Sequence, residues 1–224
     1  MNILVVDAIF SAVSVLASGE KGVYSSSFYP SSMQRGRELQ SLIQIATKQA
    51  GFEVRETEIV AVPEGPGGFT GLRLGYSVAK AISLASGASM LAIPTLTILD
   101  SSQKLYDGTV ISLIDAKRDC FFSQVFASHT PITEIYDAPI AQLLPYIEGK
   151  DDVLAVGIGL EKFKNSLQEA RFASESLSHI HIIEISPSAF PKYILDYVLN
   201  NRHLCKELKD YEGPLYIRKS DAEY

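Results

Sequence analysis

A glycine-rich segment at residues 64–75, EGPGGFTGLRLG, is the part of the sequence whose composition most clearly suggests chemistry. Such loops can cradle phosphate, because glycine lets backbone N–H groups approach an anion closely. The segment lacks the lysine of a P-loop, and its glycines do not fit the GxGxxG spacing. Thr70 could cap the following helix and leave N–H groups free for an anion, but any capped helix start offers this. The alternative is a close contact between two backbones.

The other side chains that could do chemistry form no recognisable catalytic set. The turn after Asp7 reads Ala-Ile-Phe-Ser, without the glycine that would let phosphate approach, so Asp7 is predicted to cap a turn. Cys120 has no nearby base, and the four histidines form no HxxxH or HExxH pair. His179 and His181 could face one side of a strand, but no third metal ligand stands out. The sequence predicts no catalytic residue, no metal site and no bound cofactor.

Composition limits the environment and the partners. The 224 residues carry 26 acidic and 20 basic side chains, a net charge of −6, without a basic block that would grip nucleic acid alone. Any RNA contact is therefore expected through another subunit. Two distant cysteines fit a reducing compartment, the N-terminus lacks a basic leader, and no apolar run approaches the roughly 20 residues that cross a bilayer. We expect a cytoplasmic protein without membrane contact.

Hydrophobic periodicity predicts the elements that position these residues. In the first half we expect strands at 3–7, 12–17, 23–29 and 59–62, and helices at 34–50 and 71–86. In the second half we expect strands at 110–116, 120–127, 153–159 and 180–185, helices at 138–147, 161–170 and 189–200, and an extended tail at 213–219.

The second half begins like the first. VISLIDA at 110–116 echoes NILVVDA at 2–8, with Asp115 in the place of Asp7. An internal repeat of this kind indicates a duplicated unit. Two βββαβα-type units predict an α/β fold of the actin-like, ribonuclease-H-like kind (ASKHA), with an N-terminal subdomain at 1–105 and a C-terminal subdomain at 106–224.

The helix expected at 71–86 carries a stripe of small residues on one side. Every fourth position is small, at Gly71, Gly75, Ala79, Ser83 and Gly87. An apolar stripe runs beside it at Leu74, Val78, Ile82 and Ala85. A helix this apolar must be buried nearly all round, either within its own domain or against a partner chain. Spacing alone does not choose between these alternatives.

The loop and its surroundings resemble a known family. GPGGFTGLRLG is similar to the GPGSFTGLRIG signature of the bacterial TsaB (YeaZ) proteins, with Gly68 in place of the usual serine. ILVVDA with AVSVLAS, IPTLTIL at 93–99, IDAKRDCFFSQVF, VGIG at 156–159 and the terminal PLYIRKSDAE resemble further family segments in the same order. The resemblance therefore covers essentially the whole chain.

This resemblance implies a fold, a function and partners. The fold is actin-like, with a reduced C-terminal subdomain. The function is that of a non-catalytic scaffold or activator subunit in making threonylcarbamoyladenosine at position 37 of tRNA. The partners are a catalytic threonylcarbamoyltransferase subunit (TsaD-like), paired through the N-terminal domain, and an ATPase subunit (TsaE-like). Proteins of this family often self-associate when alone, so the free protein is a candidate homodimer, and tRNA would be held only through the complex.

The resemblance also suggests which residues meet the partner. The helices at 34–50 and 71–86 would form a mixed bundle with the partner's helices, and the expected partner-binding residues are Leu39, Leu42, Ile43, Ala46, Gly71, Arg73, Gly75, Tyr76, Ala79 and Lys80. Two segments depart from the family pattern, at Ala8-Ile9 and at 35–38, where Arg-Gly-Arg-Glu replaces the usual His-Ser-Glu. The alternatives are an actin-like ATPase, a metallopeptidase-like enzyme or a homodimeric binding module.

Overall fold

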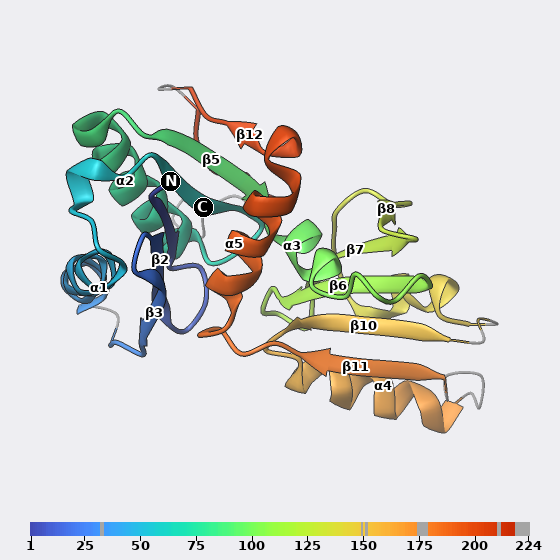
Figure 1. Cartoon of the computed structure of the whole chain (residues 1–224). Helices are drawn as coiled ribbons and strands as arrows, with labels where there is room; N and C mark the ends of the chain where they lie inside the picture. The colour runs from blue at the N-terminus through green and yellow to red at the C-terminus, as the bar shows by residue number, and fades with distance from the viewer. Residues whose placement is uncertain (32–33, 149, 151, 174–178, 210–211, 218–224) are drawn as a thin grey trace. The chain divides into compact units, whose positions relative to one another are not determined.

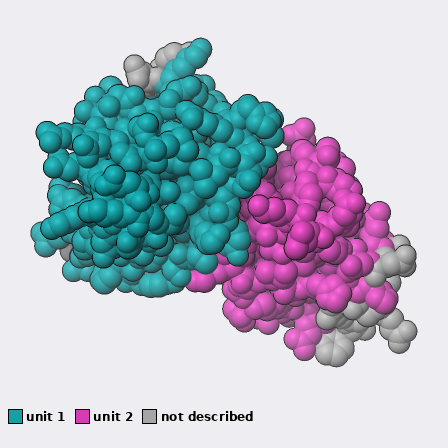
Figure 2. All heavy atoms as spheres, viewed as in Figure 1, with its two compact units in different colours: residues 1–95, 187–224 teal, residues 96–186 magenta. Residues whose placement is uncertain are grey.

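The computed structural model describes residues 1–31, 34–148, 150, 152–173, 179–209 and 212–217. These residues form two compact units, one of residues 1–95 with 187–224 and one of residues 96–186 (Figure 2). This division differs from the expected subdomains at 1–105 and 106–224. The difference arises because the last helix and the chain end pack on the N-terminal sheet, a long-range contact that local sequence patterns do not report.

Unit 1 is built on a six-stranded sheet in the order β12-β5-β4-β1-β2-β3. Its strands are β1 (Ile3–Asp7), β2 (Val13–Gly19), β3 (Gly22–Phe28), β4 (Ile59–Gly65), β5 (Ser89–Pro94) and β12 (Lys206–Glu207). The strands β1, β2 and β3 form an antiparallel meander, as their close spacing predicts, whereas β1, β4 and β5 are parallel. All five residues of β1 are buried, because this apolar strand lies in the centre of the sheet.

Helices cover both faces of this sheet (Figure 1). On one face, α1 (Arg35–Ala50) and α2 (Phe69–Ser86) pack their apolar sides onto alternate strand residues such as Leu4, Val6 and Val60. On the other face lies α5 (Phe190–Asn201), which buries residues such as Phe190 and Ile194. The short turns η2 (Val54–Glu56) and η6 (Arg202–Leu204) complete the unit.

Unit 2 has its own six-stranded sheet, in the order β11-β10-β6-β7-β8, with β9 also paired to β7. Its strands are β6 (Thr109–Asp115), β7 (Phe121–Ala127), β8 (Thr130–Pro131), β9 (Tyr136–Ala138), β10 (Val153–Ile158) and β11 (Ile180–Glu184). The helix α4 (Glu161–Ala173) packs Phe163 and Leu167 against this sheet, and α3 (Thr95–Ser101) connects β5 to the unit.

The helix expected at 138–147 is absent, and this prediction is wrong. The segment forms β9 and two short 3-10 turns, η3 (Ile140–Gln142) and η4 (Leu144–Tyr146). Pro145 lacks a backbone N–H and its ring clashes with the preceding turn, so a regular helix cannot run through it. Leu143 and Ile147 are nevertheless buried in the core of the unit, as their apolar spacing suggests.

The two units repeat one arrangement. In unit 1, β1 lies between antiparallel β2 and parallel β4, and in unit 2, β6 lies between antiparallel β7 and parallel β10. The sequence echo between 2–8 and 110–116 thus corresponds to equivalent central strands. Unit 2 is the simpler of the two, because its third strand is short and 3-10 turns replace its first helix.

Candidate functional site

The turn between β1 and β2 (residues 8–12, the β1–β2 turn) lies beside the glycine-rich segment. Asp7 is 1% exposed, and its Oδ1 accepts a hydrogen bond from the Ile9 backbone N–H at 3.0 Å. This bond confirms the turn-capping role expected for Asp7. The Ile9 side chain is also buried, so the turn has an apolar filling.

Arg35 binds the same turn from the first residue of α1. Its Nη2 donates to the carbonyl oxygens of Ala8 at 2.6 Å and Phe10 at 2.7 Å. Its Nη1 donates to the Ser11 carbonyl at 3.2 Å, and the Ala12 carbonyl lies 3.4 Å from Nη2. The guanidinium therefore lies among carbonyl oxygens from four positions of the turn, and the two N–H groups of Nη2 go to the shorter bonds, to Ala8 and Phe10.

The glycines of the loop allow the start of α2 to press against the other side of this turn. A Cβ on Gly71 would lie 2.0 Å from the Ala8 carbonyl oxygen, and a Cβ on Gly67 would lie 2.9 Å from the Ile9 Cβ. The Gly68 N–H donates to the Ile9 carbonyl at 3.2 Å. These distances leave no room for a side chain. The loop is glycine-rich because two backbones of the same chain touch there.

The helix α2 also begins two residues earlier than the start expected at residue 71. The helix begins at Phe69 after the extended residue Gly68, so Thr70 lies inside the first turn and is not the expected N-cap. Gly75 differs from Gly71, because no atom outside its own helix lies within 4 Å of the position that its Cβ would take. The stripe of small residues therefore has a steric reason at Gly71 that is lacking at Gly75.

The ten expected partner-binding residues differ in their exposure. Of the ten, Arg73 is exposed and Lys80 half-buried. The other eight are buried inside unit 1, at Leu39, Leu42, Ile43, Ala46, Gly71, Gly75, Tyr76 and Ala79. Periodicity correctly identified the apolar side of each helix, but the chain's own sheet covers that side.

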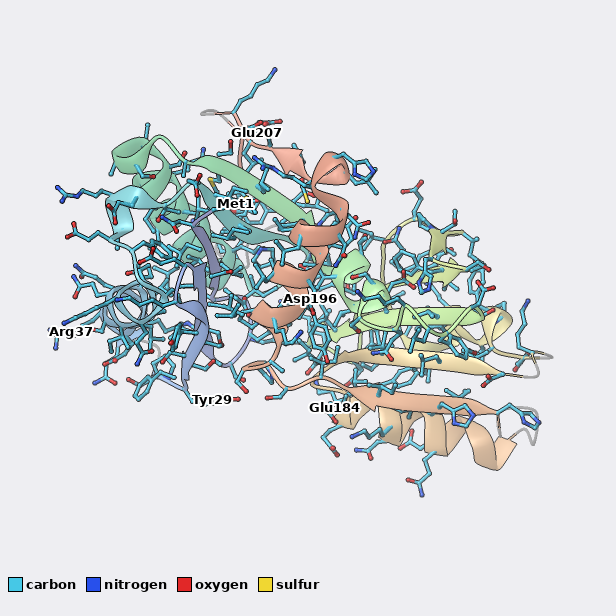
Figure 3. The ribbon with its side chains drawn as sticks, in the orientation of Figure 1. Met1, Tyr29, Arg37, Glu184, Asp196 and Glu207 are labelled. Carbon is cyan, nitrogen blue, oxygen red and sulfur yellow. The ribbon has the colours of Figure 1, made fainter. Side chains whose placement is uncertain are left out.

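The two helices also carry exposed apolar side chains that the sheet does not cover. We call the exposed residues Gln40, Gln44, Ile45, Ala81 and Leu84 the outer helical surface, together with half-buried Leu74 and Val78, which also pack against the core. Leu84 is 78% exposed and Ile45 is 49% exposed. A Cβ on Gly36 would contact Leu74 at 3.9 Å, so the two helices are neighbours at this end. Figure 3 shows Arg37 on the same side of α1, away from the sheet.

Electrostatics single out Asp7 within the site. Burial raises the pKa of its carboxyl from the ordinary value of 3.8 to about 7, although the Ile9 N–H and the nearby Arg35 charge act in the opposite direction. Its Oδ2 has no hydrogen-bond partner among the described residues. Burial likewise lowers the pKa of Arg35, against the attraction of Asp7.

The chain end contributes contacts that sequence patterns did not suggest. The Leu215 N–H donates to the Glu64 carbonyl at 2.8 Å, beside the glycine loop. Tyr216 lies against Phe69, with ring centroids 4.9 Å apart. The Arg73 guanidinium lies 3.9 Å from the centroid of the Phe69 ring. Arg73 is thus held by an aromatic stack at the start of α2. The extended tail expected at 213–219 is not assigned to a strand: residues 213–216 have no regular secondary structure, residue 217 lies in a bend, and 218 and 219 lie outside the described residues.

In unit 2, the ionisable groups singled out by sequence make local pairs. Asp115 Oδ1 accepts from the Lys117 N–H at 2.8 Å, the same turn-capping bond that Asp7 makes. His181 lies 3.4 Å from Asp152, and His129 bonds to buried Asp100 at 3.0 Å. Within the described ranges, no three His, Cys, Asp or Glu side chains group so that they could hold a metal ion.

Comparison with known proteins identifies the family. The family model described as "TsaD: tRNA N6-adenosine threonylcarbamoyltransferase" matches residues 29–224. The tRNA threonylcarbamoyladenosine biosynthesis protein TsaB of Escherichia coli K12 is 26% identical over 119 residues, which is 52% of this chain and 51% of that protein. The chain belongs to this family, in its TsaB/YeaZ branch. It spans between 29% and 51% of the length of the curated TsaB relatives that it matches.

Solved structures support the same fold. A Pseudomonas aeruginosa protein described as similar to peptidase YEAZ superposes with a TM-score of 0.71, over 97% of this chain and 99% of that one, at 18% identity. A Bacteroides thetaiotaomicron protein with an actin-like ATPase fold superposes with a TM-score of 0.53, over 87% and 95% of the two chains, at 9% identity. This TsaB/YeaZ-family chain therefore has the duplicated actin-like fold that its sequence predicts. In the described part of the chain, no helix combines the length and apolarity needed to span a membrane.

Proposed function

We propose that this chain is a non-catalytic scaffold or activator subunit in the formation of threonylcarbamoyladenosine at position 37 of tRNA. It pairs with a catalytic threonylcarbamoyltransferase subunit, and an ATPase subunit joins the pair. The relatives named TsaB and the family model named after TsaD support this pathway. A net charge of −6 supports a role in which other subunits hold the tRNA. The pairing takes place in the cytoplasm.

The observation that carries the non-catalytic part is the filled β1–β2 turn. An actin-like ATPase needs open backbone after its first aspartate, where phosphate approaches. Here the buried Ile9 side chain fills that turn, and Gly68 and Arg35 take up its carbonyl groups. A phosphate group would have to displace an apolar side chain and two sets of hydrogen bonds.

The outer helical surface supports the pairing part. Exposed leucine and isoleucine side chains on adjacent helices lose unfavourable contact with water when a partner covers them. Of the ten residues expected from the sequence, eight contribute indirectly, since they hold α1 and α2 on the sheet.

A pair of leucine substitutions tests the pairing. Leu84→Glu places a charge on the outer helical surface, where Leu84 is 78% exposed, and should weaken binding to the catalytic subunit by about tenfold or more. Leu105→Glu is the matched control, because Leu105 is fully exposed on unit 2. Both variants should fold normally, since neither leucine is buried. Binding is measured by titration calorimetry with the catalytic subunit of the same organism.

Equal affinities for Leu84→Glu and the original chain would contradict this interface. A chain that stays a homodimer in light scattering, and that shows no binding to the catalytic subunit at micromolar concentration, would favour the homodimeric binding module instead.

A further inference from the structure

The β1–β2 turn contacts all three long helices of unit 1. Arg35 binds it from α1, Gly68 and Gly71 press on it from α2, and Phe10 makes an edge-to-face contact with Phe190 of α5 at a centroid distance of 5.1 Å. The turn therefore links helices that are far apart in sequence.

The Ala8 carbonyl is the point where two of these helices meet. Its oxygen accepts from Arg35 Nη2 at 2.6 Å, and the same oxygen is the atom that a Cβ on Gly71 would meet at 2.0 Å. A shift of the turn toward either helix must therefore disturb its contact with the other helix. The N-terminal ends of α1 and α2 are coupled through this single peptide group.

We propose that Arg35 is a positioning residue for the outer helical surface: by holding the β1–β2 turn it sets α1 and α2 in the relative position that the partner subunit recognises. The inference rests on the proposed function for the identity of that partner. Arg35 itself is half-buried beneath the first turn of α1, and it acts through the turn.

Arginine is suited to this task in a way that lysine is not. The guanidinium carries donors on two terminal nitrogens in a rigid plane, and here Nη1 and Nη2 reach different carbonyls. A lysine ammonium is a single donor centre on a flexible chain. It can keep the positive charge, but it cannot hold both sides of the turn.

The protonation state of the Asp7 carboxyl affects how firmly Arg35 binds the β1–β2 turn. The Arg35 charge attracts the Asp7 carboxyl, whose pKa of about 7 leaves it partly ionised near neutral pH. The neighbouring Ser14 of β2 and the glycines of α2 are uncharged. The ionisable side chains in the first two turns of α5 are Lys192, Tyr193 and Asp196, of which Lys192 and Asp196 bond to each other at 2.7 Å. Arg35 should therefore bind the turn more firmly at pH 8 than at pH 6.

The test compares three variants of the full chain. Arg35→Met removes the donors, Arg35→Lys keeps the charge, and Arg37→Met removes an exposed arginine from the same helix without touching the turn. The first readout is amide hydrogen exchange of residues 8–12, 34–38 and 67–72, which requires no partner. In Arg35→Met, the amides of these segments should exchange at least about tenfold faster than in the original chain. Their exchange in Arg35→Lys should be nearly as fast as in Arg35→Met, and in Arg37→Met it should match that of the original chain.

The second readout is affinity for the catalytic subunit at pH 6, 7 and 8. Arg35→Met and Arg35→Lys should bind roughly tenfold more weakly than the original chain. The original chain should bind better at pH 8, and Asp7→Asn should lose that part of the pH dependence. If Arg35→Met does not fold, the hydrogen exchange and the affinity of Arg35→Lys alone test the positioning role.

The outcomes separate the two proposals. Unchanged exchange in Arg35→Lys or Arg35→Met would overturn the positioning role, and so would faster exchange with full affinity. Faster exchange in a chain whose unsubstituted form does not bind the catalytic subunit would overturn the proposed function and, with it, the role of Arg35 at that interface.

Discussion

Replacing Gly71 with alanine is expected to lower the free energy of unfolding of unit 1 by about 3 kcal/mol or more. The new Cβ would lie 2.0 Å from the Ala8 carbonyl oxygen, far inside contact distance. The carbonyl belongs to the backbone, the Cβ is fixed to the helix backbone, and Arg35 also binds this carbonyl. Neither the helix nor the turn can therefore move away without breaking other hydrogen bonds.

Gly75→Ala is the matched control for this substitution, one helical turn further along α2. No atom outside the helix lies within 4 Å of its new Cβ, so alanine should be neutral or stabilise the helix by up to about 1 kcal/mol through its higher helix propensity. Urea denaturation followed by circular dichroism at 222 nm measures both variants. Equal stabilities for Gly71→Ala and Gly75→Ala would show that the loop tolerates a side chain and that backbone contact is not the reason for its glycines.

The second large effect is expected from Asp7→Asn, and it depends on pH. The pKa of Asp7 is 3.8 ordinarily and about 7 in the folded chain, so the folded state holds this proton more tightly than the unfolded state does. The resulting stabilisation is fully present below pH 4 and is lost as the pH rises to about 7. The two pKa values correspond to a total loss of about 4 kcal/mol. Asparagine keeps the acceptor for the Ile9 N–H and has no proton to lose.

The measurement is the free energy of unfolding of both proteins between pH 4 and 8. The stability of the original chain should fall relative to Asp7→Asn across this range, and the variant should be the more stable protein at pH 8. Other groups titrate in both proteins, so the difference between the two curves is the quantity that matters. Parallel curves would mean that Asp7 is ionised throughout the range, and that Arg35 outweighs the cost of its burial.

Several elements could be predicted from local pattern. The apolar run 3–7 became β1, and the 3.6-residue periodicity of 34–50 became α1 with only one residue of difference at its start. The echo between 2–8 and 110–116 anticipated the duplicated fold, and the ordered motifs anticipated the family. The prediction of a helix at 138–147 was wrong because the apolar periodicity runs through Pro145, which a regular helix does not accommodate.

The sequence by itself therefore determined most of the strands and helices and the apolar side of α1 and α2, whereas it left the reason for the glycines at 65–71 open between phosphate binding and close backbone contact. Only the tertiary structure decided what meets those surfaces. It placed the apolar sides of α1 and α2 on the chain's own sheet, the Ala8 carbonyl against Gly71, and the Arg35 guanidinium inside the turn. The physical reason is that periodicity and turn chemistry are local, whereas Arg35 and Gly71 lie 27 and 63 positions from Ala8, and their meeting depends on how the strands pair.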